Sequence, residues 1–86
     1  MCLFYNLLSD NAGKILKRER KAWGMSRKRL ARLTNIEPEV IEDIEKGYVC
    51  MMNYDMLIRF CKVLEISPFI FFIRKLTNEE ILEIIK

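Results

Sequence analysis

The pattern of apolar and polar positions is most regular just past the middle of the chain. Four apolar side chains recur there at i, i+3, i+4 and i+7, the spacing of an amphipathic helix that buries one face: Leu57, Phe60, Cys61 and Leu64. Asn53 precedes them and suits an N-cap, because its side-chain oxygen can accept a backbone N–H of the first turn. The pattern predicts a helix over residues 54–65.

A second amphipathic segment covers residues 12–23. Its residues Leu16, Arg20 and Trp23 fall on one face at i, i+4 and i+7. Gly24 follows directly, and glycine is common just past the end of a helix. We predict a helix that ends before Gly24 and directs this face at the core.

The stretch MSRKRLARL, which begins at Met25, predicts another helix. Ser26 is a good N-cap, because its hydroxyl can accept a backbone N–H from the first turn. Leu30 and Leu33 stand at i and i+3, and we expect both to face inward. The helix is short, so its stability depends on packing that face.

A short turn and a further helix follow. Asn35 lies in the turn and tolerates the left-handed backbone conformation. Pro38 suits the first position of a helix, because its missing N–H has no intrahelical partner there. Ile41 and Ile44 share one face of the helix that we predict over residues 38–46.

Two more helices are predicted after residue 66. Ser67 and Pro68 suit the cap and the first position of a short fifth helix, in the stretch SPFIFFIRK. Thr77 and Glu80 form a capping-box pattern ahead of four apolar residues, Ile81, Leu82, Ile84 and Ile85. These are too many apolar residues for a free tail.

These segments together predict an all-α fold. The 86 residues include only three Gly and two Pro, which mark few of the tight turns that a sheet protein needs. We expect three regions: an N-terminal apolar extension over 1–12, a bundle of five helices over 13–73, and a C-terminal helix over 74–86 that is a candidate dimerisation element.

The composition argues against catalytic and metal chemistry. The chain has no histidine, and its cysteines are widely spaced, at Cys2, Cys50 and Cys61. A zinc site and a nucleophile–base pair therefore lack their residues. We expect no catalytic residue, no metal and no cofactor. No apolar run approaches the roughly 20 residues that span a membrane, and three reduced thiols fit a cytoplasmic protein.

Charge is distributed unevenly along the chain. Residues 1–36 carry nine Lys or Arg and two Asp or Glu, a balance of +7. Residues 37–86 carry six Lys or Arg and ten Asp or Glu, a balance of −4. The basic half could attract a nucleic acid, or it could be a solvated surface without a partner.

Residues 30–47, LARLTNIEPEVIEDIEKG, resemble the helix-turn-helix core of the Cro/C1-type (XRE-like, lambda-repressor-like) DNA-binding family. The segments LKRERKAWGMS and YDMLIRFCKVLEIS resemble the family's first and fourth helices, so the resemblance covers residues 13–73. It implies a five-helix lambda-repressor-like DNA-binding domain, with short helical or extended additions at both ends. It further implies a small transcriptional regulator that binds specific DNA sequences.

The resemblance implies that double-stranded DNA is the partner, and it assigns site residues. Phosphate contacts come from the second helix: Ser26, Arg27, Lys28, Arg29 and Arg32. The third helix faces the major groove with Glu37, Pro38, Glu39, Glu42, Asp43 and Lys46. In the family, an inward arginine such as Arg20 pairs with the glutamate before the closing glycine, here Glu45. A lone inward charge would otherwise be costly.

The third helix is acidic where the family usually places small polar or basic residues. One account keeps DNA as the partner, because carboxylates can accept a hydrogen bond from cytosine N4 while the second helix holds the phosphates. The alternative is a helix-turn-helix fold that binds a protein partner and has little affinity for DNA. The apolar loop 48–52 supports this alternative, because methionine and aromatic residues suit adaptable contacts. Core packing of Met51 and Met52 would weaken it.

The two chain ends exceed what a five-helix core needs. The apolar segments Leu3–Leu8 and Ile81–Ile85 either pack on each other across the back of one bundle or form a twofold interface between two copies. We favour a homodimer, which would set the spacing of half-sites on a palindromic operator.

Overall fold

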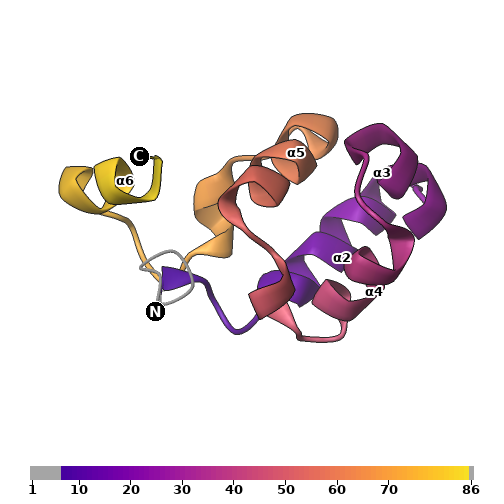
Figure 1. Ribbon diagram of the computed structural model, residues 1–86, viewed down its shortest axis with the longest axis horizontal. Helices are drawn as coiled ribbons and strands as arrows, with labels where there is room; N and C mark the ends of the chain where they lie inside the picture. Colours follow the sequence, from indigo (N-terminus) through magenta and orange to yellow (C-terminus); the bar gives the residue numbers. More distant parts are fainter. Residues whose placement is uncertain (1–6, 86) are drawn as a thin grey trace.

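The computed structural model describes residues 7–85, and these form an all-α fold, as the sequence predicts. Five α-helices are present in this range: α2 (Ala12–Ala22), α3 (Arg27–Thr34), α4 (Pro38–Glu45), α5 (Tyr54–Leu64) and α6 (Asn78–Ile85). Two 3₁₀ helices complete it: η1 (Val49–Met51) and η2 (Pro68–Phe71). The helices α2 to α5 gather into one bundle, and α6 lies at the end of the molecule opposite α3 and α4 (Figure 1).

The core of the bundle is formed by the stripes that the hydrophobic pattern predicts. Leu57, Phe60 and Leu64 of α5 are buried. Ile41 and Ile44 of α4 are fully buried and belong to the same cluster. The inward faces of α4 and α5 are therefore confirmed, and they place α4 firmly against the bundle.

Cys61 completes the α5 stripe as a small core residue. Its side chain is buried within the cluster. Burial raises the pKa of the Cys61 thiol to about 12, because the thiolate would lose its hydration. The residue therefore stays neutral and packs as an apolar side chain, as the sequence indicates.

The caps of α3 and α5 are those expected from the sequence. Ser26 Oγ accepts the backbone N–H of Arg29 at 3.1 Å. Asn53 Oδ1 accepts the backbone N–H of Met56 at 2.9 Å. Each cap satisfies one of the backbone donors that a helix leaves free at its start. These helices therefore begin where the sequence places them, because capping depends on neighbours in the chain.

Two of the expected inward side chains lie partly outside the core. Leu33 is 49% exposed, so the prediction that it faces inward is wrong. The inward residues of α3 are instead Leu30, Ala31 and Thr34, because α4 and α5 contact the helix along that line. Trp23 lies beyond the last residue of α2 and is half exposed, with its indole N–H donating to the Leu64 carbonyl at 2.8 Å.

The fifth helix is shorter than expected and is a 3₁₀ turn. Ser67 Oγ accepts the N–H of Phe69 at 3.2 Å, and Pro68 is the first helical residue. The helix ends at Phe71 because the next backbone groups pair with the N-terminal segment. Ile73 donates its N–H to the Leu7 carbonyl at 2.8 Å, and Leu8 forms an antiparallel bridge with Phe72.

The described part of the N-terminal extension closes the core of its own chain. Leu7 and Leu8 are buried beside η2, and they are part of the main hydrophobic cluster. The remaining residues of the segment Leu3–Leu8 lie outside the described range. For Leu7 and Leu8, the structure thus shows packing within one monomer, against the segment that follows η2.

The helix α6 is attached by its capping box and by part of its apolar face. Glu80 donates its N–H to Thr77 Oγ1 at 3.2 Å, and the Thr77 N–H donates to Glu80 Oε1 at 3.0 Å. Ile81 and Ile84 pack against the core cluster, whereas Leu82 and Ile85 are exposed. Two of the four apolar side chains of α6 are therefore left exposed.

We expect Glu80 to titrate with a pKa of about 2, below its ordinary value of 4.5. The Arg74 guanidinium donates two hydrogen bonds to its carboxylate, and the Thr77 N–H donates a third. A depressed pKa means that the native state favours the carboxylate. The contribution of the Glu80 carboxylate to the attachment of α6 is therefore complete above pH 4.5 and is lost as the pH falls through about 2. Carboxyl NMR titration measures this pKa.

Two substitutions test the cause of that shift. Arg74→Ala removes the largest contribution and should return the Glu80 pKa toward 4.5. Lys75→Ala is the matched control, because it removes a neighbouring positive charge without removing a hydrogen bond to Glu80, and it should leave the titration in place. An unchanged titration in the Arg74 variant would contradict the assignment.

Candidate nucleic-acid interface

The candidate interface is built on the turn that joins α3 to α4. Asn35 adopts the left-handed conformation, with φ 57° and ψ 40°. The N–H of Ile36 donates to the Ala31 carbonyl at 3.2 Å, and the Ile36 side chain is buried. Pro38 then starts α4 with a fixed backbone angle. The turn is held by backbone bonds and by a core side chain, so α3 and α4 have one relative orientation.

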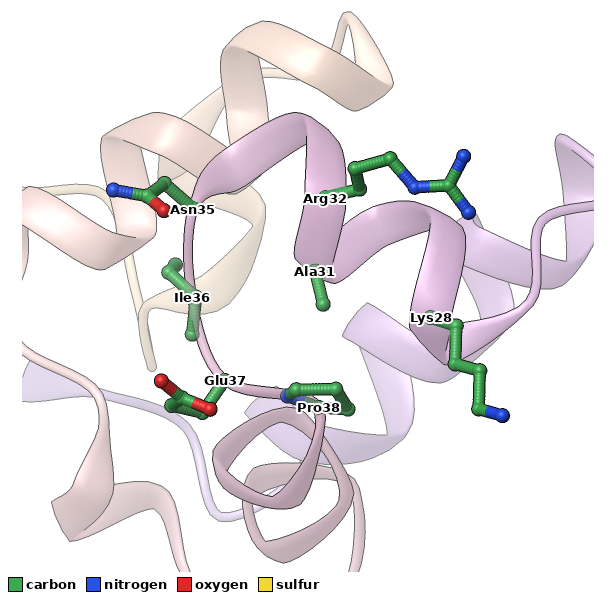
Figure 2. A pocket seen from close by; sticks show the side chains of 7 residues that line it. All are labelled: Lys28, Ala31, Arg32, Asn35, Ile36, Glu37 and Pro38. Atoms are coloured by element: carbon green, nitrogen blue, oxygen red, sulfur yellow. The ribbon is translucent and has the colours of Figure 1, made fainter.

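A shallow hollow lies beside this turn (Figure 2). It is lined by residues of α3, of the turn and of the start of α4: Lys28, Ala31, Arg32, Asn35, Ile36, Glu37 and Pro38. Figure 2 shows Ala31 pointing into the hollow, where its small side chain leaves room between the helices. Lys28 and Arg32 extend from α3 away from Ile36 and Glu37. The hollow therefore has a basic side and an acidic side.

Three cations on α3 are exposed: Lys28, Arg29 and Arg32. None of them has an acidic partner among the ion pairs of the described residues. Ser26, at the N-cap, is exposed as well, although its hydroxyl oxygen is engaged by the Arg29 N–H. This surface could accept anionic groups without breaking an internal ion pair.

Arg27 differs from the other cations of α3, because it turns back toward α4. Its Nε donates to Glu45 Oε1 at 3.0 Å. Its Nη1 lies 3.7 Å from Glu42 Oε2. The side chain keeps 35% of its exposure, so one part of the guanidinium is held and another part faces solvent.

Arg20 and Glu45 form a buried ion pair beneath the interface. Arg20 Nε and Nη2 donate to the two carboxylate oxygens at 2.7 and 3.0 Å. The Arg20 side chain is 7% exposed and that of Glu45 is 1% exposed. Arg20 Nη1 also donates to the Met25 carbonyl at 2.7 Å, which ties the start of α3 to α2. Glu45 therefore contributes no surface charge to α4.

The remaining acidic residues of α4 have different surroundings. Glu39 is exposed in the first turn, where its charge is favourable to the helix dipole. Glu42 lies between two cations, at 3.7 Å from Arg27 and 3.5 Å from Lys46. Asp43 is half-buried. Glu37 occupies the N-cap position and makes no capping hydrogen bond with its side chain. The outward face of α4 thus carries fewer unpaired carboxylates than the sequence alone indicates.

The loop after α4 divides between core and surface. Met52 is fully buried, as core packing would require. Met51 is exposed and Tyr48 is 61% exposed, so both are available to a partner. Val49 packs partly against the core. The apolar loop 48–52 therefore offers a partner Tyr48 and Met51, whereas Met52 belongs to the core.

One residue that supports the turn is not apparent from the motif. Arg59 of α5 donates from Nη1 to the Thr34 carbonyl at 3.2 Å, at the C-terminal end of α3. Its Nε is 3.0 Å from Asp55, four positions earlier on α5. The i, i+4 spacing of Asp55 and Arg59 is a signal for that ion pair. The link to Thr34 depends on tertiary packing, and the sequence gives no sign of it.

Two helices around a left-handed turn, braced by a helix on each side, define a helix-turn-helix domain, a class of fold whose second helix commonly enters the major groove of DNA. A family model described as a helix-turn-helix domain matches residues 15–68, from α2 to the start of η2. The chain therefore belongs to the helix-turn-helix family. Comparison with curated proteins finds no match. Within residues 7–85, no helix is long and apolar enough to cross a membrane.

Proposed function

We propose that this protein is a small transcriptional regulator of the Cro/C1 type that binds specific sequences of double-stranded DNA. The observation that carries the proposal is the row of exposed cations on α3, Lys28, Arg29 and Arg32, beside the turn of a helix-turn-helix domain. Phosphate contacts supply most of the affinity of such a protein, and contacts with base edges supply its specificity.

In this proposal the two helices have separate tasks. The α3 helix holds the DNA backbone through Ser26, Arg27, Lys28, Arg29 and Arg32. The α4 helix faces the bases through Glu37, Pro38, Glu39, Glu42, Asp43 and Lys46. Carboxylates on α4 would accept hydrogen bonds from cytosine N4. The rigid turn supports this division, because it holds α4 in one orientation relative to the backbone contacts.

We expect the protein to bind a mixed-sequence duplex with an affinity that falls steeply between about 50 and 200 mM salt. Lys28→Ala and Arg32→Ala should each weaken binding to all sequences alike. Each should also reduce the salt slope, which is the slope of log K for DNA binding against log salt concentration, by about 1. The reason is that each variant makes one phosphate contact fewer, so that one counterion fewer is released from the DNA on binding. Fluorescence anisotropy measures both quantities.

The matched control is Lys75→Ala. Lys75 is an exposed cation in the segment that leads into α6, and α6 lies at the opposite end of the molecule from α3 and α4 (Figure 1). Its removal lowers the net charge equally but should leave the salt slope unchanged. Absence of binding at about 50 mM salt would overturn the proposal.

A protein-binding role is the second candidate, and the exposed Tyr48 and Met51 favour it. In this case the native protein would not bind DNA. The double substitution Glu39→Lys with Asp43→Lys should then create an affinity for DNA that the natural chain lacks, because the α3 cations are already present. The same anisotropy titration distinguishes the two roles.

Assembly into a homodimer belongs to the same proposal. The exposed Leu82 and Ile85 of α6 support an interface through the segment Ile81–Ile85, because they leave apolar surface uncovered on one monomer. A twofold dimer would present two copies of α4 to successive half-sites of a palindromic operator.

A further inference from the structure

A chain of alternating charges runs from the core of the bundle to the outward face of α4. Glu45 accepts hydrogen bonds from both Arg20 and Arg27. Arg27 in turn lies beside Glu42, and Glu42 lies beside Lys46. Exposure increases along this chain, from 1% for the Glu45 side chain to 43% for Glu42 and 60% for Lys46. This series of charged residues is therefore buried at its Arg20–Glu45 end and exposed to solvent at its Lys46 end.

The inner contacts are hydrogen bonds and the outer ones are not. Arg20 and Arg27 approach Glu45 at 2.7 and 3.0 Å. Glu42 lies 3.7 Å from Arg27 and 3.5 Å from Lys46, beyond the usual range of a hydrogen bond. Ion pairs of this length between exposed groups contribute little to stability. Glu42 can therefore be exchanged for another anion, whereas Glu45 cannot.

Arg27 is positioned to receive such an anion. Its Nε donates to the buried Glu45, which anchors the guanidinium at that atom, and its Nη1 lies 3.7 Å from Glu42 Oε2. Arginine binds phosphate strongly when its planar group is already oriented, because two parallel hydrogen bonds can form. The Glu42 carboxylate thus lies where a DNA phosphate would meet Arg27 and Lys46.

We propose that Glu42 is an internal competitor of DNA phosphate for Arg27 and Lys46, so that it tunes the affinity of the protein instead of reading a base. The inference rests on the proposed function, because it assumes that this surface binds DNA. It changes one assignment within that function, since Glu42 and Lys46 then act at the phosphates and not at the bases. The proposal explains two of the carboxylates on α4. Glu45 belongs to the core, and Glu42 lies beside two of the cations that would bind DNA.

Glu42→Gln tests the competition, because it keeps the size of the side chain and removes its charge. We expect about tenfold tighter binding of a mixed-sequence duplex at about 100 mM salt, with a salt slope steeper by about 2. Two cations become available to phosphate in this variant. Sequence preference, measured by selection from a random duplex pool, should not change.

Glu65→Gln is the matched control. It removes the same charge from an exposed position at the end of α5, outside the surface assigned to DNA, where no ion pair joins it to a described residue. Loss of one negative charge at that position should raise affinity by no more than about twofold, with no change in the salt slope. In an Arg27→Gln background, the gain from Glu42→Gln should be smaller, because only Lys46 is then released.

The outcomes separate this inference from the proposed function. If the native protein binds DNA but Glu42→Gln gains no more affinity than Glu65→Gln, the competition is overturned and DNA binding stands. A changed sequence preference in Glu42→Gln would also overturn it, because Glu42 would then read a base. If only Glu42→Gln binds DNA, the competition stands and the native function lies elsewhere. If no variant binds, both are overturned.

Discussion

Glu45→Gln is expected to lower the free energy of unfolding by about 3–5 kcal/mol. The substitution keeps the shape of the side chain but leaves Arg20 as a buried cation without a counterion. It also turns an amide N–H₂ toward a guanidinium that only donates hydrogen bonds. Urea unfolding followed by far-UV circular dichroism measures the change. The loss is a large part of the total stability of a domain of this size.

Two variants show whether the buried charge is the cause. Glu39→Gln makes the same chemical change at an exposed position of α4, and it should shift stability by less than about 0.5 kcal/mol. Arg20→Met combined with Glu45→Met removes both charges and should recover most of the loss, since apolar replacements of a buried pair are often neutral. A Glu45→Gln protein as stable as the native one would contradict the assignment of a buried, charge-dependent pair.

Gly13→Ala is expected to destabilise the protein by about 2 kcal/mol, although alanine is the better helix former. A Cβ atom at this position would overlap the carbonyl oxygen of Ile44. That oxygen belongs to the backbone of α4, so the helix itself would have to move away from α2. We assign about 3 kcal/mol to the overlap and about 1 kcal/mol to the opposing gain in helix propensity.

The adjacent exposed residue provides the control for this prediction. Lys14→Ala also introduces alanine into the first turn of α2, but at the surface, and it should change stability by less than about 0.5 kcal/mol. Both variants are measured by urea unfolding. A more stable Gly13→Ala protein would mean that α2 and α4 are not in direct backbone contact at this point.

Features that depend on neighbours along the chain could be predicted from the sequence. The α5 stripe, the caps at Ser26 and Asn53 and the left-handed Asn35 all depend on residues within one turn of a helix. The all-α fold follows from several such segments in a chain with few turn residues. Local spacing is sufficient for these features because helix formation and capping are local events.

Features that depend on how helices cross could not be predicted in the same way. Leu33 has the spacing of an inward residue, but α4 and α5 contact α3 along a different line. In sequence, Gly13 is merely a weak helix former, whereas the fold places it directly against the backbone of α4. η2 ends early because the residues after it, Phe72 and Ile73, pair with the backbone of Leu8 and Leu7. These partners are more than sixty positions away in the sequence.

The candidate site shows the same division between local and tertiary features. The exposure of Lys28 and Arg32 follows from their place on the outer face of α3. The double engagement of Arg27 by Glu45 and Glu42 does not, because it requires α3 and α4 to be at their observed distance. The sequence therefore suggests more unpaired cations on α3 and more unpaired carboxylates on α4 than the structure has.

The rigid turn between α3 and α4 has a consequence for evolvability. Its shape depends on Ala31, Asn35 and Ile36, none of which belongs to the outward face of α4. The outward positions Glu39 and Asp43 carry no core packing that the fold needs. Substitutions there can accumulate with little loss of stability. The scaffold can therefore be retargeted to a new ligand by exchanging a few surface residues, while the geometry that presents them is inherited unchanged.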